Sequence, residues 1–256
     1  MKASYIHYLL LNLLLIQSNN LLASPMIKVP AGWHRPFLKE SLNKSSVPVA
    51  VQSFYLDTRP VNRADFLLFL KEHPEWNRAR ASRLYVDDNY LYKWSLNKNT
   101  EEELKKSPAN FVSWFAAKAY CESQNKRLPT EIEWEYAASF PAKGSSIRDL
   151  QKLILDWYAA PRQDSMPHMG QFVNRLGLED MHGLMWEWVY DFNTASVTGD
   201  SRQDPDIENS LFCGAGSLSS NDFSNYAAYM RYGFRTGLKG WYSSKYLGFR
   251  CAANRP

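Results

Sequence analysis

PANFVSWFAAKAYCESQNKRLPTEIEWEYAA, residues 108–138, is the stretch that decides the fold of this 256-residue chain. Ser113 can cap a first helix, in which apolar residues recur at helical spacing. Asn125 is a candidate for the left-handed residue that ends this helix. Thr130 and Glu133 then form the T-x-x-E capping box that begins a second helix. The stretch therefore predicts two short helices joined by a stiff turn.

Two further blocks of the sequence contain motifs as distinctive as those of this stretch. MGQFVNRLGLEDMHGLMWEWV occupies residues 169–189, and a C-terminal block combines GAGS at 214–217, R-x-x-x-R at 231–235 and LGFRCA at 247–252. Together with V-S-W-x-x-A-x-A-Y-C and R-L-P-T-E-x-E-W-E-Y-A-A, they resemble, in order, the formylglycine-generating enzyme family, also called sulfatase-modifying factors. The resemblance implies one compact α+β domain over residues 26–256, with much irregular structure and a C-type-lectin-like core.

The N-terminus has the pattern of a secretory signal peptide. Lys2 precedes an apolar run at residues 9–16, and the segment Leu21-Leu22-Ala23-Ser24 ends in small residues. Residues 1–23 are therefore predicted to be removed. The mature protein would be exported to the periplasm or the extracellular space, without a membrane span.

Composition excludes one class of partner and favours another. The formal charge is only +4, and the basic residues are spread along the chain without forming a stripe, so nucleic acid is not expected as a partner. Aromatic residues make up 14% of the chain. Such a surplus is typical of large cores and interfaces.

Local patterns also predict elements outside the opening stretch. Residues 26–29 and 49–56 are expected to form strands. Asn62 can cap a helix, and Glu–Lys pairs four residues apart favour an exposed helix at residues 100–106. Three carboxylates are candidates to hold Arg250 or Arg235 in buried ion pairs, namely Asp180, Glu187 and Asp191.

The resemblance also implies a copper site, and here the chain departs from the family. Family members oxidise a substrate cysteine at a copper ion held by two cysteine thiolates, and the matching positions in this chain are Ser220 and Asn225. Neither side chain can replace a thiolate on Cu(I). Copper is therefore not expected as a cofactor, and conventional formylglycine synthesis is not expected as the activity.

The chain has three cysteines, Cys121, Cys213 and Cys251, an odd number for an oxidising compartment. Spacing alone leaves all three pairings open. By resemblance to the family, Cys121 pairs with Cys251, and Cys213 is left over. A buried apolar thiol is the favoured interpretation of Cys213, with a reactive or metal-binding thiol as the alternative.

Metal sites receive little support. A family calcium site uses an asparagine whose place is taken by Leu184, which has no side-chain oxygen. Asn174 and Glu187 remain as weak calcium candidates, so calcium is possible and no cofactor is assigned. The histidines beyond the signal peptide are scattered, without the spacing of an iron triad.

The leading functional hypothesis is an exported family member that binds a peptide, protein or other extended ligand in the family groove. Its expected lining, apart from the positions that match the cysteine pair, is Ser217, Asp222, Tyr229, Arg231, Tyr90 and Trp94. For the aromatic, basic segment at residues 76–94 the favoured alternative is a surface loop that packs its aromatics on the core.

Two rival functions stay open. One is an oxidoreductase of the same superfamily that performs oxidative or tailoring chemistry with other residues, either formylglycine-type protein oxidation or siderophore maturation. The other is a structural subunit of an envelope complex.

Overall fold

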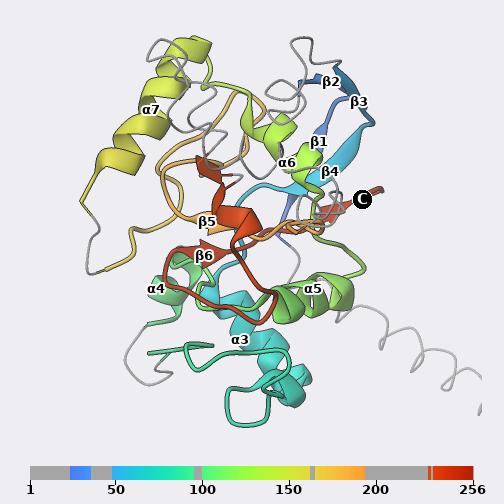
Figure 1. Ribbon diagram of the computed structural model, residues 1–256, viewed down its shortest axis with the longest axis vertical. Helices are drawn as coiled ribbons and strands as arrows, with labels where there is room; N and C mark the ends of the chain where they lie inside the picture. The colour runs from blue at the N-terminus through green and yellow to red at the C-terminus, as the bar shows by residue number, and fades with distance from the viewer. Residues whose placement is uncertain are drawn as a thin grey trace, which may run out of the picture.

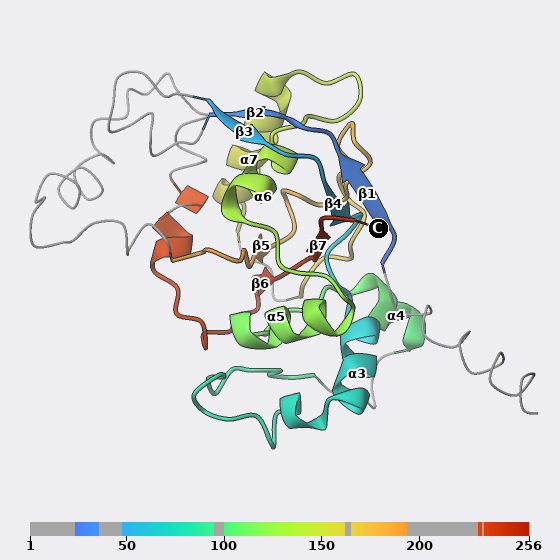
Figure 2. The same cartoon turned by 90° about the vertical axis from the view of Figure 1, so that its right-hand side faces the viewer.

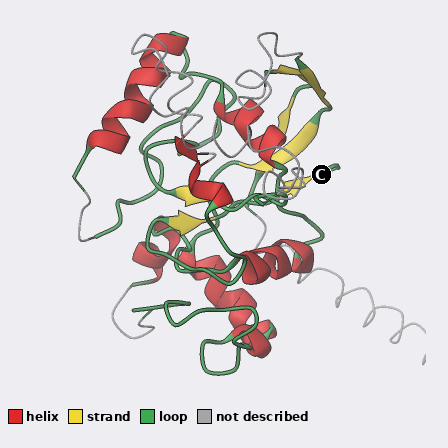
Figure 3. Cartoon of the chain, in the orientation of Figure 1, coloured by secondary structure: helices red, strands yellow, loops and turns green. Residues whose placement is uncertain are grey.

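Short helices and strands joined by long loops make up the computed structural model (Figure 3), which describes residues 24–35, 48–94, 100–161, 165–193, 230–231 and 233–255. The helices are α3 (Arg63–Glu72), the 3-10 turn η1 (Pro74–Trp76), α4 (Glu101–Lys106), α5 (Trp114–Ser123), α6 (Glu131–Ala138) and α7 (Ile147–Ala159). The chain is also helical at residues 230–231 and 233–236. Together with the strands, these elements form a single α+β domain, as predicted.

The strands form small sheets. Strands β1 (Met26–Val29), β4 (Phe54–Asp57) and β7 (Ala252–Ala253) form an antiparallel sheet in the order β1-β4-β7, while β2 (Gly32–His34) pairs with β3 (Val49–Val51) and β5 (Trp186–Glu187) pairs in parallel with β6 (Leu247–Gly248). The single strand expected at residues 49–56 is therefore two strands. The strand is interrupted at residues 52–53 because β3 pairs with β2, whereas β4 pairs with β1.

The elements separate along the long axis of the molecule. Helices α3, α4 and α5 gather at one end, and α7 stands at the other (Figures 1 and 2). The β1–β4 pair runs along one side, with α6 nearby. No helix among the described residues is both long and apolar enough to span a bilayer.

The local signals of the opening stretch are confirmed. The Ser113 side chain accepts from the main-chain nitrogen of Ala116 at the start of α5, and Asn125 follows that helix with a φ of 55°. Thr130 and Glu133 form the expected reciprocal capping box at the start of α6. Both helices therefore begin where their sequence predicts.

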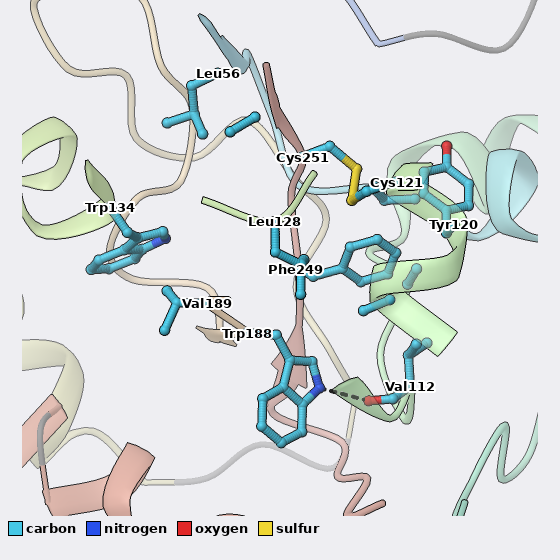
Figure 4. Close-up of a cluster of buried hydrophobic side chains, with 14 of the residues drawn as sticks. Leu56, Val112, Tyr120, Cys121, Leu128, Trp134, Trp188, Val189, Phe249 and Cys251 are labelled. Carbon is cyan, nitrogen blue, oxygen red and sulfur yellow. Dashed lines mark hydrogen bonds between the residues drawn. A yellow bond between two sulfur atoms is a disulfide. The ribbon is translucent and has the colours of Figure 1, made fainter. Parts of the chain in front are cut away.

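The disulfide implied by the resemblance is present. Cys121 of α5 is bonded to Cys251, which precedes β7, across a sequence separation of 130 residues (Figure 4). Both cysteines are fully buried among core side chains that include Leu128 and Phe249. The bond ties the segment before β7 to α5.

A second link beside the disulfide is ionic. Lys126 Nζ lies 2.5 Å from Asp57 Oδ1, and both side chains are buried. Asp57 Oδ2 also accepts from the main-chain nitrogen of Cys251, while Lys126 donates to the carbonyl of Ser24. Burial raises the pKa of Asp57 to about 6, although Lys126 opposes the rise.

Of the three carboxylates expected to hold an arginine, one does so. Arg250 is fully buried, and its Nε and Nη2 lie 2.8 Å from the two oxygens of Glu187. Asp180 instead accepts from three successive main-chain nitrogens at residues 170–172, and Asp191 accepts from the nitrogen of Glu131. Loop ends offer unpaired amides, and these two carboxylates satisfy them.

Helix α7 occupies a segment for which the sequence analysis predicts no element. Ser146 and Asp149 form a capping box at its start. Its buried side chains, Leu150 and Ile154, form a small separate core with neighbours that include Phe172.

Candidate functional site

Four charged side chains form a cluster on α6, called here the α6 ion cluster: Glu131, Glu135, Arg231 and Arg235. Arg231 grips Glu135 with two nitrogens, at 2.7 Å for Nη2 and 2.9 Å for Nε. Arg235 Nη1 donates to Glu135 at 2.7 Å and to Glu131 at 3.1 Å. Glu131 and Glu135 are four residues apart on α6, as Arg231 and Arg235 are in the helical residues 230–231 and 233–236, so one face of α6 meets one face of these residues.

The charges in the cluster are mutually stabilised. Burial alone would raise the pKa of Glu135, but Arg231 and Arg235 outweigh it and hold that pKa below its usual range. Burial also raises the pKa of Glu131, with Arg235 opposing the rise. Glu135 is therefore a fixed anion rather than a proton donor or acceptor near neutral pH.

Trp134 joins this cluster to the core pair of Arg250 and Glu187. The guanidinium of Arg235 lies 4.8 Å from the Trp134 ring centroid, and the indole Nε1 donates to Glu187 Oε2 at 2.7 Å. His182 packs edge-on against the same indole, and burial lowers its pKa to about 3. This histidine is neutral and its Nε2 lies 3.0 Å from the carbonyl of Ala138.

The second feature is a continuous row of aromatic rings, called here the aromatic ridge: Trp76, Tyr85, Phe115, Trp114 and Tyr190. Successive ring centroids lie 6.1, 5.0, 5.3 and 6.1 Å apart. Tyr85 is 44% exposed and Tyr190 is 52% exposed, while the rings between them are half-buried. The ridge therefore offers an aromatic surface on the outside of α5.

The ridge and the α6 ion cluster are neighbours. Asp191, the residue after Tyr190, accepts from the main-chain nitrogen of Glu131. On the other side, the carbonyl of Gly240 accepts from the nitrogen of Trp114, and the chain reaches Gly240 directly from Arg235. Residues 230–240 therefore lead from the cluster to the ridge.

Most of the predicted site lies outside the described residues, namely Ser217, Ser220, Asp222, Asn225, Tyr229 and also Cys213. Arg231 is described, and its side chain is only 10% exposed. Its guanidinium holds Glu135 of α6. Its partner Glu135 was missed because only the tertiary fold joins residues 96 positions apart.

The two remaining groove candidates, Tyr90 and Trp94, pack toward the core. Tyr90 is fully buried, and its hydroxyl donates to the carbonyl of Trp76. Trp94 packs against the core, edge-on to Phe66 and beneath the guanidinium of Arg63 at 5.2 Å. At these two positions the segment packs its aromatic rings on the core, in agreement with the favoured alternative of a surface loop. Burying a ring removes apolar surface from water, which stabilises the fold.

The side-chain oxygens of both calcium candidates accept hydrogen bonds from other groups of the protein. Asn174 Oδ1 accepts from the nitrogens of Leu176 and Leu178, and its amide donates to the carbonyl of Ala137. Both oxygens of Glu187 accept from Arg250. Among the described residues no group of three His, Cys, Asp or Glu side chains could hold a metal ion.

Comparison with known proteins agrees with this architecture. The family model of the sulfatase-modifying factor enzyme 1-like domain matches residues 15–255. The chain belongs to this family. Within the sulfatase-modifying factor family it is similar to the inactive C-alpha-formylglycine-generating enzyme 2 of Mus musculus, with 34% identity over 252 residues, covering 81% of this chain and 78% of the relative.

Other similarities are partial or concern the fold. The serine/threonine-protein kinase pkn1 of Chlamydia pneumoniae is 31% identical over 169 residues, covering 62% of this chain. The chain matches 26% of that relative, or about a quarter of its length. Among solved structures, Treponema denticola variable protein 1 has the same fold, with a TM-score of 0.50 and 15% identity, covering 90% of this chain and 94% of that one.

Proposed function

We propose that this sulfatase-modifying factor family member is exported and binds an extended peptide, without copper-dependent oxidation of a cysteine. One observation carries the proposal. The chain has three cysteines, and Cys121 and Cys251 are consumed by the disulfide. Only Cys213 is left, so the chain cannot supply the pair of thiolates that the copper chemistry of the family requires.

Two further observations support this proposal. The mouse relative carries the name of an inactive formylglycine-generating enzyme. A buried disulfide is typical of proteins that fold in an oxidising compartment, which supports export after removal of residues 1–23.

Binding is supported by the aromatic ridge. Its two exposed rings, Tyr85 and Tyr190, are side chains of the type that dominates binding energy at protein interfaces. The α6 ion cluster fixes Arg231 and Arg235 against α6, and the chain then runs from Arg235 to Gly240, whose carbonyl accepts from the nitrogen of Trp114 in the ridge. An extended chain crossing the ridge would contact rings held in place by α5.

The absence of oxidase chemistry is tested with protein that begins at Ser24. Cu(I) titration and oxygen consumption with a cysteine-containing peptide should both give no stoichiometric response. Thiol titration in denaturant without reductant should find one thiol per chain. Tight stoichiometric Cu(I) binding with oxygen uptake would overturn the proposal, and three titratable thiols would contradict the disulfide.

Peptide binding is tested with a library of random linear peptides. We expect Tyr190→Ala and Tyr85→Ala each to weaken the selected peptides by about tenfold, as for aromatic residues at interface hot spots. Trp33→Ala is the matched control, because Trp33 is 71% exposed but lies on β2, away from the ridge. Failure to select any peptide, or equal effects of all three variants, would refute binding at the ridge.

A further inference from the structure

A surface rich in cations continues from the aromatic ridge, formed by residues 78–93 and 239–246 and called here the cationic surface. Asp87 fastens the two segments together: its nitrogen donates to the carbonyl of Trp241, and its carboxylate accepts from the nitrogen and hydroxyl of Ser243. A second connection runs through Phe111, whose carbonyl accepts from the nitrogen of Leu91 and whose nitrogen donates to the carbonyl of Ser244. The two segments therefore present one surface.

The charge of this surface is strongly one-sided. Its two segments contain six basic residues, Arg78, Arg80, Arg83, Lys93, Lys239 and Lys245, and two acidic residues, Asp87 and Asp88. Asp87 is engaged with Ser243, and Asp88 pairs with Arg83. Among the described residues no carboxylate forms an ion pair with Arg78, Arg80, Lys93 or Lys239, so these four charges can attract an anion from outside the surface.

Aromatic rings hold these cations in place. Arg78 and Lys93 lie over the ring of Tyr92, at 5.7 and 5.3 Å from its centroid. Lys239 lies 5.1 Å above the Trp241 ring, and Lys245 lies 5.1 Å above the Tyr246 ring. Cations placed over rings lose less conformational freedom when they bind an anion.

The backbone beneath Tyr92 is strained. Leu91, Lys93 and Phe111 have φ values of 51°, 59° and 54°, in the left-handed region that such side chains seldom adopt. The nitrogen of Leu91 donates to the carbonyl of Phe111, which links the strained residues. Strain of this kind persists where the surrounding structure fixes it, often at binding sites.

The cationic surface and the aromatic ridge meet at Gly240. A Cβ atom at this position would lie 2.9 Å from Phe115 of the ridge, so only glycine allows the close approach. The next residue is Trp241. Lys239 lies over its ring, and its carbonyl accepts from the nitrogen of Asp87. A ligand that leaves the ridge at Phe115 therefore arrives at Lys239.

From this continuity we infer that the peptide bound by this protein is acidic at one end: apolar and aromatic residues lie on the ridge, and Asp or Glu residues lie on the cationic surface. The inference rests on the proposed peptide binding. Carboxylates are the peptide groups that Lys and Arg bind best, through charge-assisted hydrogen bonds. The rings over which Arg78, Lys93, Lys239 and Lys245 lie already carry cations on their faces, which disfavours stacking of nucleic-acid bases on them.

The test compares three peptides of equal length that share an aromatic, apolar half and differ in the other half, which is Glu-rich, Gln-rich or Lys-rich. Fluorescence anisotropy at two salt concentrations measures each affinity. We expect the Glu peptide to bind most tightly and to weaken as salt rises. The double variant Lys93→Asn/Lys239→Gln should weaken the Glu peptide by about tenfold, toward the affinity of the Gln peptide.

The variants are chosen to keep the fold. Asn tolerates the positive φ of residue 93, and Lys239 is exposed. Arg148→Gln/Lys152→Gln on α7 removes the same charge from an exposed site elsewhere and should leave binding unchanged. An equal loss in this control would mean that net charge, rather than the cationic surface, attracts the peptide, and would overturn the inference.

The remaining outcomes separate the inference from the proposed function. If the Gln or Lys peptide binds as tightly as the Glu peptide while Tyr190→Ala weakens all of them, the acidic preference is refuted and peptide binding stands. If no peptide binds, the proposed function fails as well. Tighter binding of a heparin oligosaccharide or a single-stranded oligonucleotide than of the Glu peptide would overturn the peptide class.

Discussion

Arg250 and Arg231 are both buried, and both grip a glutamate with two nitrogens, yet their surroundings differ. Arg250 also donates to the carbonyls of Asp57, Thr58 and Glu179, so each of its nitrogens has a partner. The Nη1 of Arg231 is buried without a well-formed hydrogen bond. Burial would lower the pKa of its guanidinium, but Glu135 and the hydroxyl of Tyr158 outweigh burial and raise it.

The difference separates two roles for the same chemical pair. Around Arg250, a network in which every guanidinium nitrogen has a hydrogen-bond partner joins β4, β5 and the C-terminal strand. It lies next to the disulfide and the Asp57–Lys126 pair. Around Arg231, an incompletely satisfied network joins α6 to the turn that leads to the aromatic ridge. A buried polar network that is fully satisfied fixes a core, whereas a partly satisfied one is easier to rearrange.

The largest effect should come from the disulfide on the Arg250 side. Replacing Cys121 and Cys251 by Ala should lower the free energy of unfolding by about 5 kcal/mol, the chain-entropy value for a loop of this length. Urea unfolding monitored by tryptophan fluorescence measures the loss. A loss below about 1 kcal/mol would show that the C-terminal strand is held without the bond.

The next largest effect should come from Glu187→Gln. The variant leaves the charge of Arg250 buried without a counter-charge, which should cost about 3–5 kcal/mol in unfolding free energy. Lys152→Gln, which breaks an exposed pair on α7, is the control and should cost less than about 0.5 kcal/mol. Equal costs for the two variants would contradict the structural role of the Arg250 network.

The pH dependence of stability should reveal Asp57. Its pKa is raised to about 6 from 3.8, so the folded state holds a proton that the unfolded state releases. This contribution is fully present below the unfolded pKa and is lost as pH rises through 6. Unfolding free energy should therefore fall by up to about 3 kcal/mol between about pH 4 and pH 7, relative to Asp57→Asn. A wild-type profile parallel to that of Asp57→Asn would refute the raised pKa.

The smallest of these effects should come from Glu135→Gln. Its charge-assisted hydrogen bonds to Arg231 and Arg235 should contribute about 2 kcal/mol, with the loss confined to the 230–236 turn. Hydrogen exchange should show reduced protection there and unchanged protection in α5. Loss of protection throughout the core would remove the contrast between the two arginine networks.

The sequence carries the local part of this architecture. Ser113, Asn62 and Thr130 begin their helices as their capping patterns predict, because a cap depends on residues three positions away. The order of motifs leads to the family and to the Cys121–Cys251 bond. Helix α7 also had such a signal, since Ser146 and Asp149 form a capping box before an apolar face.

Contacts between distant segments could not be predicted from local sequence patterns. Glu135 pairs with Arg231, and Asp180 accepts from backbone amides rather than from an arginine. Both contacts depend on where loops end in the folded chain. Tyr90 and Tyr92 are two residues apart, yet one is fully buried and the other is 42% exposed. In an irregular segment no fixed period tells which aromatic ring turns inward.

The position of β7 sets the timing of folding during synthesis. The last strand of the sheet, together with Arg250 and Cys251, comes from residues 247–253, while its partner β4 comes from residues 54–57. Neither the disulfide nor the Arg250 network can form until residues 247–253 have left the ribosome. Strand β4 therefore stays without its partner β7 until the whole intervening chain has been made, and a stop codon before residue 247 would leave a product without the disulfide and without the Arg250 network.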